Sequence, residues 1–160
     1  LDILSQEMRK IPVNPFSIVL DLEFSNDPHT ISAIFDRFIE EECSIVDLKF
    51  VYTEMNCFYL NTDSWYFGPY GFTDMIYLSE EDFGSFDYES IEYYSQLTGM
   101  ESLQDVYKNH REQEDYAKWI CTFLVASKFH KLIKAAADQM RHKLPIVADA
   151  HDVGFSGRIS

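Results

Sequence analysis

EQEDYAKWICTFLVASKFHKLIKAAADQMRHK, residues 112–143, is the longest helical pattern in the chain and predicts the helix on which the fold is built. Its apolar residues recur at three- and four-residue spacing, as they do along one face of an α-helix. These residues are Tyr116, Ile120, Phe123, Leu124, Ile133, Ala136, Ala137 and Met140. Acids stand at the start of the segment and bases toward its end, which is the order that the helix dipole favours. Pro145 then ends the helix.

The chain upstream of this helix contains patterns of both strand and helix. Residues 16–24 (FSIVLDLEF) place most apolar side chains on one face and polar ones on the other, which predicts a strand. Asp27 has the residue type of an N-cap and Pro28 that of a first helical position, so a helix is expected from there to about Glu42. A short leading helix is expected over residues 2–10.

The middle of the chain predicts a hairpin and the end a further strand. Residues 45–53 alternate apolar and polar side chains, and we expect them to pair antiparallel with residues 57–61. Residues 63–73 are interrupted by two glycines and a proline, which predicts an irregular aromatic loop. Residues 87–97 are expected to be helical, and a capping-box pattern predicts a further helix over residues 98–110. Residues 146–148 are expected to form a last short strand.

This order of elements predicts an α+β fold. We expect a small, mostly antiparallel sheet of three to five strands, with helices packed on one face and a long C-terminal helix. A chain of 160 residues is long enough for one globular domain with a core of its own. Residues 154–160 are expected to form a loose tail.

Charge is distributed unevenly along the chain, whose net charge is −14. Residues 1–100 contain 19 Asp and Glu against 4 Lys and Arg, whereas residues 101–160 contain 8 against 9. Between Lys49 and Lys108 there is no basic residue, and those 58 residues contain 11 carboxylates and 16 of the 25 aromatic residues. Nucleic acid and anionic membranes require basic charge, so neither is an expected ligand. A basic protein partner is the natural complement.

The acidic aromatic segment from Asp63 to Asp87 is the candidate partner-binding surface, because rigid aromatics form binding hot spots and carboxylates attract a basic partner. Its candidate residues are Asp63, Trp65, Tyr66, Tyr70, Asp74, Glu80, Glu81, Asp82 and Asp87, with Glu40, Glu41 and Glu42 as a rim. The competing interpretation is that the aromatic side chains form the core and the carboxylates are merely solvated. Residues 79–82 also fit a capped helix start, whereas acids at 40–42 oppose the helix dipole.

No residue pattern predicts a catalytic, metal or cofactor site. Asp149, His151 and Asp152, with His142 upstream, are the residue types of metal ligands, but their spacing matches no known metal motif. Glycine loops of the phosphate-binding kind are absent. The three cysteines, Cys43, Cys57 and Cys121, are too scattered for a disulfide framework or a zinc motif and are expected to be structural thiols.

We therefore expect an acidic protein-binding module that neutralises or regulates a basic partner. In general character, though in no residue motif, such a chain is similar to bacterial immunity proteins, which inactivate toxins; the partner would be a toxin or nuclease whose active site is occluded. One alternative is a hydrolase-type enzyme that uses carboxylates or the Asp149, His151 and Asp152 group. Another is a structural subunit whose long helix packs against a copy, so that the protein is a monomer or a small homo-oligomer. Without a signal peptide or a membrane-spanning run, the expected location is cytoplasmic.

Overall fold

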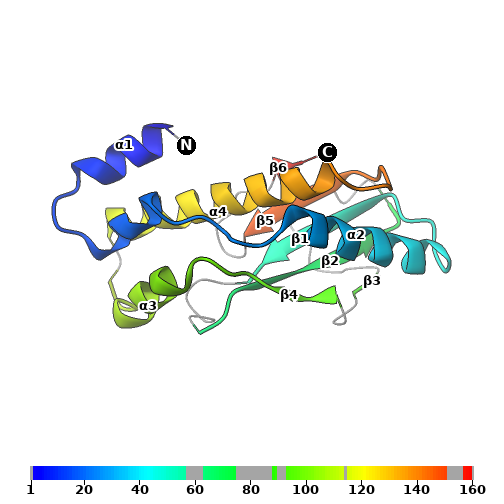
Figure 1. The fold of residues 1–160 in the computed structure, drawn as a ribbon, viewed down its shortest axis with the longest axis horizontal. Helices are drawn as coiled ribbons and strands as arrows, with labels where there is room; N and C mark the ends of the chain where they lie inside the picture. The colour runs from blue at the N-terminus through cyan, green and yellow to red at the C-terminus, as the bar shows by residue number, and fades with distance from the viewer. Residues whose placement is uncertain are drawn as a thin grey trace.

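A computed structural model of the chain describes residues 2–56, 63–74, 88–89, 93–113, 115–150 and 157–159 (Figure 1). The helices are α1 (Asp2–Lys10), the 3-10 helix η1 (Pro15–Leu20), α2 (Pro28–Cys43), α3 (Glu101–Asn109) and α4 (Tyr116–Ala137). The strands are β1 (Phe50–Met55), β2 (Tyr66–Phe72), β3 (Tyr88–Glu89), β4 (Ser95–Gln96), β5 (Ile146–Ala150) and β6 (Gly157–Arg158). The described elements thus confirm an α+β fold.

The sheet is built around β1, which pairs over its whole length with a strand on either side. The strand order is β3-β2-β1-β5-β6, and β4 also pairs with β2. Among the strands of the described residues, the β1–β5 pairing is parallel and the other pairings are antiparallel. Tyr52 in β1 is therefore opposite Tyr70 of β2 and Val147 of β5. The prediction of a small, mostly antiparallel sheet is confirmed.

Helix α4 is the central element of the helical layer, and Figure 1 shows it running along the long axis of the molecule. It contacts α1, η1, α2 and β5, and its buried side chains join the main core together with Val51, Met55 and Ile146 of the sheet. The long helix is confirmed, but it is shorter than predicted. It begins after Asp115, whose carboxylate accepts a hydrogen bond from the Lys118 backbone nitrogen (2.9 Å), and it ends at Ala137.

The prediction of a strand over residues 16–24 is wrong. Residues 15–20 form the 3-10 helix η1, and the chain from residue 22 to residue 27 is irregular. Phe16 and Val19 are buried, and a spacing of three is the period of a 3-10 helix. Lys128 of α4 holds the irregular part, since its ammonium donates to the Leu22 carbonyl and to the Glu23 carboxylate, both at 2.6 Å.

The prediction of an irregular loop over residues 63–73 is also wrong, because β2 lies there and is the antiparallel partner of β1. The expected partner, residues 57–61, lies outside the described residues. Of the segment 45–53, only residues from Phe50 onward are in the strand. At the C-terminus, Gly157–Arg158 pair with β5, and the Ile159 nitrogen donates to the Ile146 carbonyl at 2.7 Å.

The helices predicted over residues 2–10, 28–42 and 98–110 are present, but residues 88–89 and 95–96, which were predicted to be helical, lie in strands β3 and β4. Helix α1 has the predicted bounds, and α2 begins as expected with Asp27, whose carboxylate accepts from the His29 and Thr30 backbone nitrogens (3.1 and 3.2 Å). Helix α3 lies within residues 98–110, but its N-cap is Met100 rather than Thr98. Gly99 precedes it with a φ of +95°, and a Cβ there would lie 2.4 Å from the Glu23 carbonyl oxygen, so the position requires glycine.

A buried carboxylate joins α2 to the turn that follows α4. The Asp36 side chain, 5% exposed, accepts from the backbone nitrogens of Arg141 (3.1 Å) and His142 (3.0 Å) and from the Arg141 Nε (3.2 Å). Burial alone raises the pKa of this carboxyl, but the hydrogen bonds from His142 and Arg141 outweigh it and hold the pKa below its ordinary value. Among the described residues, no helix has the length and apolarity needed to cross a bilayer.

We expect Asp36→Asn to lower the free energy of unfolding by about 2 kcal/mol at neutral pH, because a charged acceptor of several hydrogen bonds is lost. Since the folded pKa of Asp36 is depressed, its contribution is complete above the unfolded pKa and is lost as the pH falls below about 4. Urea unfolding of both proteins at a series of pH values measures the difference, which should shrink toward acid. Asp21→Asn, at an exposed position, is the control; a constant difference across the series would contradict this role of Asp36.

Candidate functional site

The two faces of the sheet have different neighbours. In β1, Val51 and Met55 belong to the main core with the helices, whereas Phe50 and Tyr52 belong to a second cluster on the opposite face. In β2, Phe67 joins the main core, and Tyr70 and Phe72 join the second cluster. This alternation is that of a strand, in which successive side chains point to opposite faces. We call this opposite side of the sheet the tyrosine face. Its residues are Tyr52, which is buried (3% exposed), and Glu54, Tyr66, Tyr70, Tyr94 and Asp149, which are partly or more fully exposed.

The tyrosines of this face form one continuous row. The ring centroid of Tyr94 lies 5.6 Å from that of Tyr66 and 6.3 Å from that of Tyr70, and the Tyr70 centroid lies 6.0 Å from that of Tyr52. The hydroxyls of Tyr70 and Tyr94 are 2.9 Å apart and share a hydrogen bond. The Tyr94 ring lies directly over Gly68, where a Cβ would come within 1.9 Å of it. Gly68 therefore makes the position of Tyr94 in the row sterically accessible.

Buried aromatic packing supports this row. Phe50 and Phe72, opposite each other in β1 and β2, stack with ring centroids 4.6 Å apart and an interplanar angle of 2°. The Phe72 ring also contacts that of Tyr52, at 6.4 Å and nearly perpendicular. Together with Val147 these side chains are almost fully buried. Cross-strand aromatic pairs stabilise an antiparallel sheet, so the tyrosines rest on a rigid base.

Two carboxylates lie at the Tyr52 end of the row. The Tyr52 hydroxyl donates to the Asp149 carboxylate at 3.4 Å. Burial raises the pKa of Tyr52 far above its ordinary value, and the negative charges of Glu54 and Asp149 raise it further, so that the phenol stays protonated. Strands β1, β2 and β5 contain no Lys or Arg, and among the strand residues that the structure describes the only basic one is Arg158 in β6.

These groups can bind cations. Carboxylate oxygens accept charge-assisted hydrogen bonds from Lys and Arg, and tyrosine rings attract the same side chains by cation–π contact. Tyr94 also lines a groove of about 310 Å³ between α2 and β4, whose other lining residues are Thr30, Ala33, Ile34, Arg37, Tyr93 and Ser95. Tyr94 therefore lies between the tyrosine face and a groove that is lined mostly by α2.

The predicted partner-binding residues of β2 are only partly on this surface. Tyr66, which is 36% exposed, and Tyr70 belong to the row. Asp63 and Asp74 are exposed just before and just after β2, and Asp63 forms an ion pair with Lys108 of α3 (2.5 Å). Trp65 is fully buried and packs edge-on against Tyr107 (5.8 Å), so it is a core residue and lies on no surface of this conformation. Glu80, Glu81, Asp82 and Asp87 lie outside the described residues.

The acids at the end of α2 have cations beside them. Glu40 forms an ion pair with Arg141 (2.9 Å) and lies 3.2 Å from the His142 Nε2. Glu41 accepts from Arg37 Nε (2.8 Å) and also from the Tyr93 hydroxyl. Glu42 is partly buried in the last turn of the helix. The predicted position against the helix dipole is correct, but local cations offset the charge of Glu40 and Glu41.

The residues considered for catalysis or metal binding are not brought together in the described parts of the chain. Asp149 is on the tyrosine face, His142 lies beside Glu40, and His151 and Asp152 lie outside the described residues. Within the described ranges, no group of three or more His, Cys, Asp or Glu is placed to hold a metal ion. Burial raises the pKa of the Cys121 thiol to about 12, although a hydrogen bond with Tyr107 lowers it slightly. At neutral pH this cysteine is an unreactive packing residue.

Tyr52, Glu54 and Tyr94 were not predicted as site residues. Tyr52 and Glu54 alternate with Val51 and Met55 in β1, and this period of two was the available signal. Tyr94 reaches the row because residues 95–96 pair with β2, and no local pattern indicates such a pairing.

We expect Gly68→Ala to displace the Tyr94 ring and break its contact with the Tyr70 hydroxyl, at a cost of about 1–3 kcal/mol in the free energy of unfolding, as for other overpacked sites. In a Tyr94→Ala background the same substitution should cost much less, because the ring that it meets is gone. Urea unfolding of the two single variants and the double variant gives this coupling as a double-mutant cycle. Additive effects would show that Gly68 and Tyr94 do not interact.

No family model matches the chain, and comparisons with curated proteins and with solved structures also found no match. The chemistry of the tyrosine face is therefore the basis on which its function is inferred.

Proposed function

We propose that the protein binds a basic protein partner through the tyrosine face and thereby neutralises or regulates it. The observation that supports this proposal best is the unbroken row Tyr66–Tyr94–Tyr70–Tyr52, which ends at two carboxylates on strands without Lys or Arg. A surface of this composition is suited to lysine and arginine side chains, which combine positive charge with an apolar stem.

Each component of the face has a separate role in this proposal. The exposed ring of Tyr66 and the partly exposed rings of Tyr70 and Tyr94 anchor the partner, since tyrosine supplies a large contact area at low conformational cost. Glu54 and Asp149 receive its cationic groups. Asp74, just after β2, extends the negative potential beyond the row, whereas the charge of Asp63 is offset by its ion pair with Lys108. The net charge of −14 accelerates the approach of a basic protein over a longer range.

Occlusion is the mechanism that this arrangement favours. A toxin or nuclease that acts on nucleic acid has a cationic active site or groove, and a rigid acidic surface placed over it blocks access by the substrate. The protein then acts as an inhibitor or immunity protein by covering that site, without any chemical step of its own.

Affinity capture of partners from the native cell, eluted with rising salt, tests the proposal. We expect the wild-type protein to retain a basic protein that elutes as the salt concentration rises, because the attraction is screened. The double variant Tyr66→Ala/Glu54→Gln should bind that protein with an affinity at least about tenfold lower than the wild type. Titration with the purified partner measures this difference.

The matched control is Asp105→Asn/Glu112→Gln, which removes two exposed acids from α3 and from the turn before α4. It changes the net charge more than the test variant but leaves the tyrosine face intact. Equal loss of binding in both variants would show that net charge alone attracts the partner. Retention of only acidic or neutral proteins, insensitive to salt, would refute the proposal.

A further inference from the structure

Helix α4 has one stripe of exposed and partly exposed side chains. Its contacts with α1, η1, α2 and β5 bury most of its circumference. Tyr116 is nevertheless 63% exposed and Trp119 50% exposed, and Phe123, whose ring centroid lies 6.5 Å from that of Trp119, is partly exposed. Most of the predicted apolar stripe is buried in the core, but Tyr116 and Phe123 of that stripe are not. Exposed aromatics in a row are the residue types of a binding hot spot.

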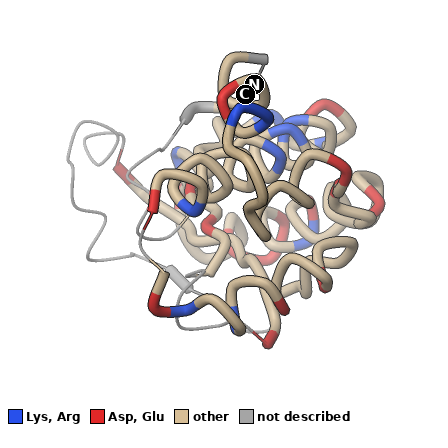
Figure 2. The backbone as a smooth tube through the Cα atoms, turned by 90° about the vertical axis from the view of Figure 1, so that its left-hand side faces the viewer, with Lys and Arg blue, Asp and Glu red and all other residues tan. Residues whose placement is uncertain are grey.

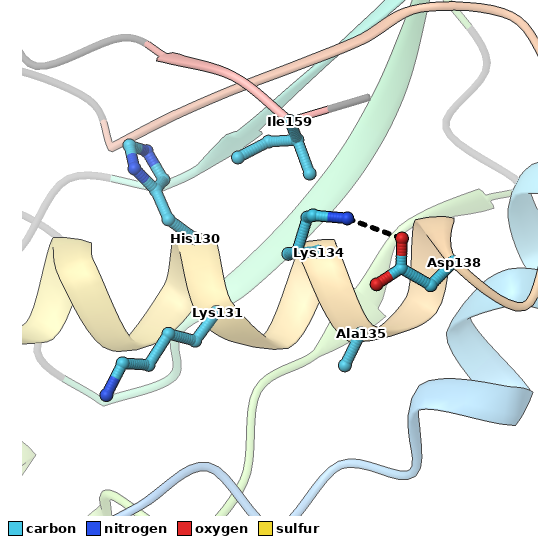
Figure 3. A pocket seen from close by; sticks show the side chains of 6 residues that line it. All are labelled: His130, Lys131, Lys134, Ala135, Asp138 and Ile159. Atoms are coloured by element: carbon cyan, nitrogen blue, oxygen red, sulfur yellow. Dashed lines mark hydrogen bonds and ion pairs between the residues drawn. The ribbon is translucent and has the colours of Figure 1, made fainter.

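The same stripe continues toward the end of the helix with Ser127, Lys131 and Lys134. Lys131 and Lys134 also line a shallow pocket of about 470 Å³ with His130, Ala135, Asp138 and Ile159. In Figure 3, Lys134 is directed along the helix toward Asp138, with which it forms an ion pair, and Lys131 is directed the opposite way along the helix. The stripe thus has an aromatic first half and a cationic second half.

The intervals between the residues of the stripe are the same when they are counted from either end of the helix. Its exposed or partly exposed residues are Tyr116, Trp119, Phe123, Ser127, Lys131 and Lys134. The intervals between them are three, four, four, four and three residues, so the pattern is symmetric about Val125. A twofold axis through that point would place Tyr116 of one chain opposite Lys134 of another, and Trp119 opposite Lys131. Residue i then contacts residue j and j contacts i, as an isologous interface requires.

We propose that a second copy of this chain covers the stripe, so that two α4 helices pack antiparallel about a twofold axis near Val125. Each Lys131 and Lys134 lies over an aromatic ring of the other copy and gains a cation–π contact. Lys134 exchanges for this contact an exposed ion pair with Asp138, which contributes little. Phe123 packs against Ser127 of the other copy at the centre.

Charge indicates a second copy rather than another partner. The aromatic half of the stripe complements the cationic half of the same stripe, so no further protein is needed to satisfy both. Two chains of net charge −14 repel each other over most of their surfaces, and they can approach where Lys and Arg are concentrated. In the view of Figure 2, several Lys and Arg positions are drawn in the upper part of the tube, whereas Asp and Glu positions are spread around the outline.

This inference is independent of the proposed function. Helix α4 belongs to the core on one face of the sheet, and the tyrosine face is on the other. The dimer therefore leaves both tyrosine faces free. A partner that presents two basic sites could contact both faces at once and would be bound with greater avidity.

Trp119 provides the test, because the chain has two tryptophans and the other, Trp65, is fully buried. The protein is examined by sedimentation velocity and by acrylamide quenching of tryptophan fluorescence from about 1 µM to about 1 mM, a range that spans weak to moderate dimers. We expect the mass to rise to that of a dimer as quenching falls, since Trp119 becomes covered. Added salt should strengthen the dimer by screening the repulsion between chains, whereas it weakens binding of a basic partner.

Variants locate the interface. Trp119→Ala and Lys131→Glu should each weaken the dimer at least about tenfold, as hot-spot residues do. Lys49→Glu, with the same change of charge at an exposed position before β1, should have much less effect, and Tyr66→Ala on the tyrosine face should have none. A monomer with unchanged quenching over the whole range would overturn the proposal. So would a dimer that resists both α4 substitutions, or open-ended growth beyond the dimer.

Discussion

The tyrosine face depends on the pairing of β1 with β2 on one side and β5 on the other. Because side chains alternate along a strand, a shift of one residue in this register would exchange the two faces of the sheet. Tyr70 would then point into the helical core and Phe67 away from it. Burial of Val51, Met55 and Phe67 against α2 and α4 opposes such a shift, since burying a large apolar side chain is worth about 1.5–3 kcal/mol. Burial of these core side chains therefore also determines which side chains lie on the tyrosine face.

Local signals predicted the helices best. Asp27 and Pro28 mark the start of α2 because capping is a property of adjacent residues. The three- and four-residue spacing of apolar side chains indicated α4, although Glu112 and Lys143, which were read as part of its charge order, lie outside its bounds. The error at residues 16–24 arose because apolar residues were counted at a period of two. Pro15 sets a helical φ at the start of η1, and Lys128, which holds the next residues, is more than 100 positions away.

The site was predicted less completely than the fold, and β2 shows why. Gly68, Pro69 and Gly71 indicated a loop, yet the missing side chain at Gly68 makes room for the Tyr94 ring, which comes from a segment that is distant in sequence. Trp65 and Tyr66 were both predicted to be on the surface, but neighbours in an extended chain point to opposite sides. Only Tyr66 is outside. The amino-acid composition identified the aromatic segment. Which of its side chains are buried and which are exposed depends on the register of strand pairing, which the sequence alone did not reveal.

The Asp36 contact also has a kinetic consequence. Its partners Arg141 and His142 are 105 and 106 residues away along the chain, so the contact closes a loop that spans most of the protein. Closing so long a loop is entropically costly until the intervening elements have formed, and we therefore expect the contact to be absent from the folding transition state. An interaction of that kind slows unfolding and leaves the rate of folding almost unchanged. Asp36 would determine how long the native state persists rather than how quickly it is reached.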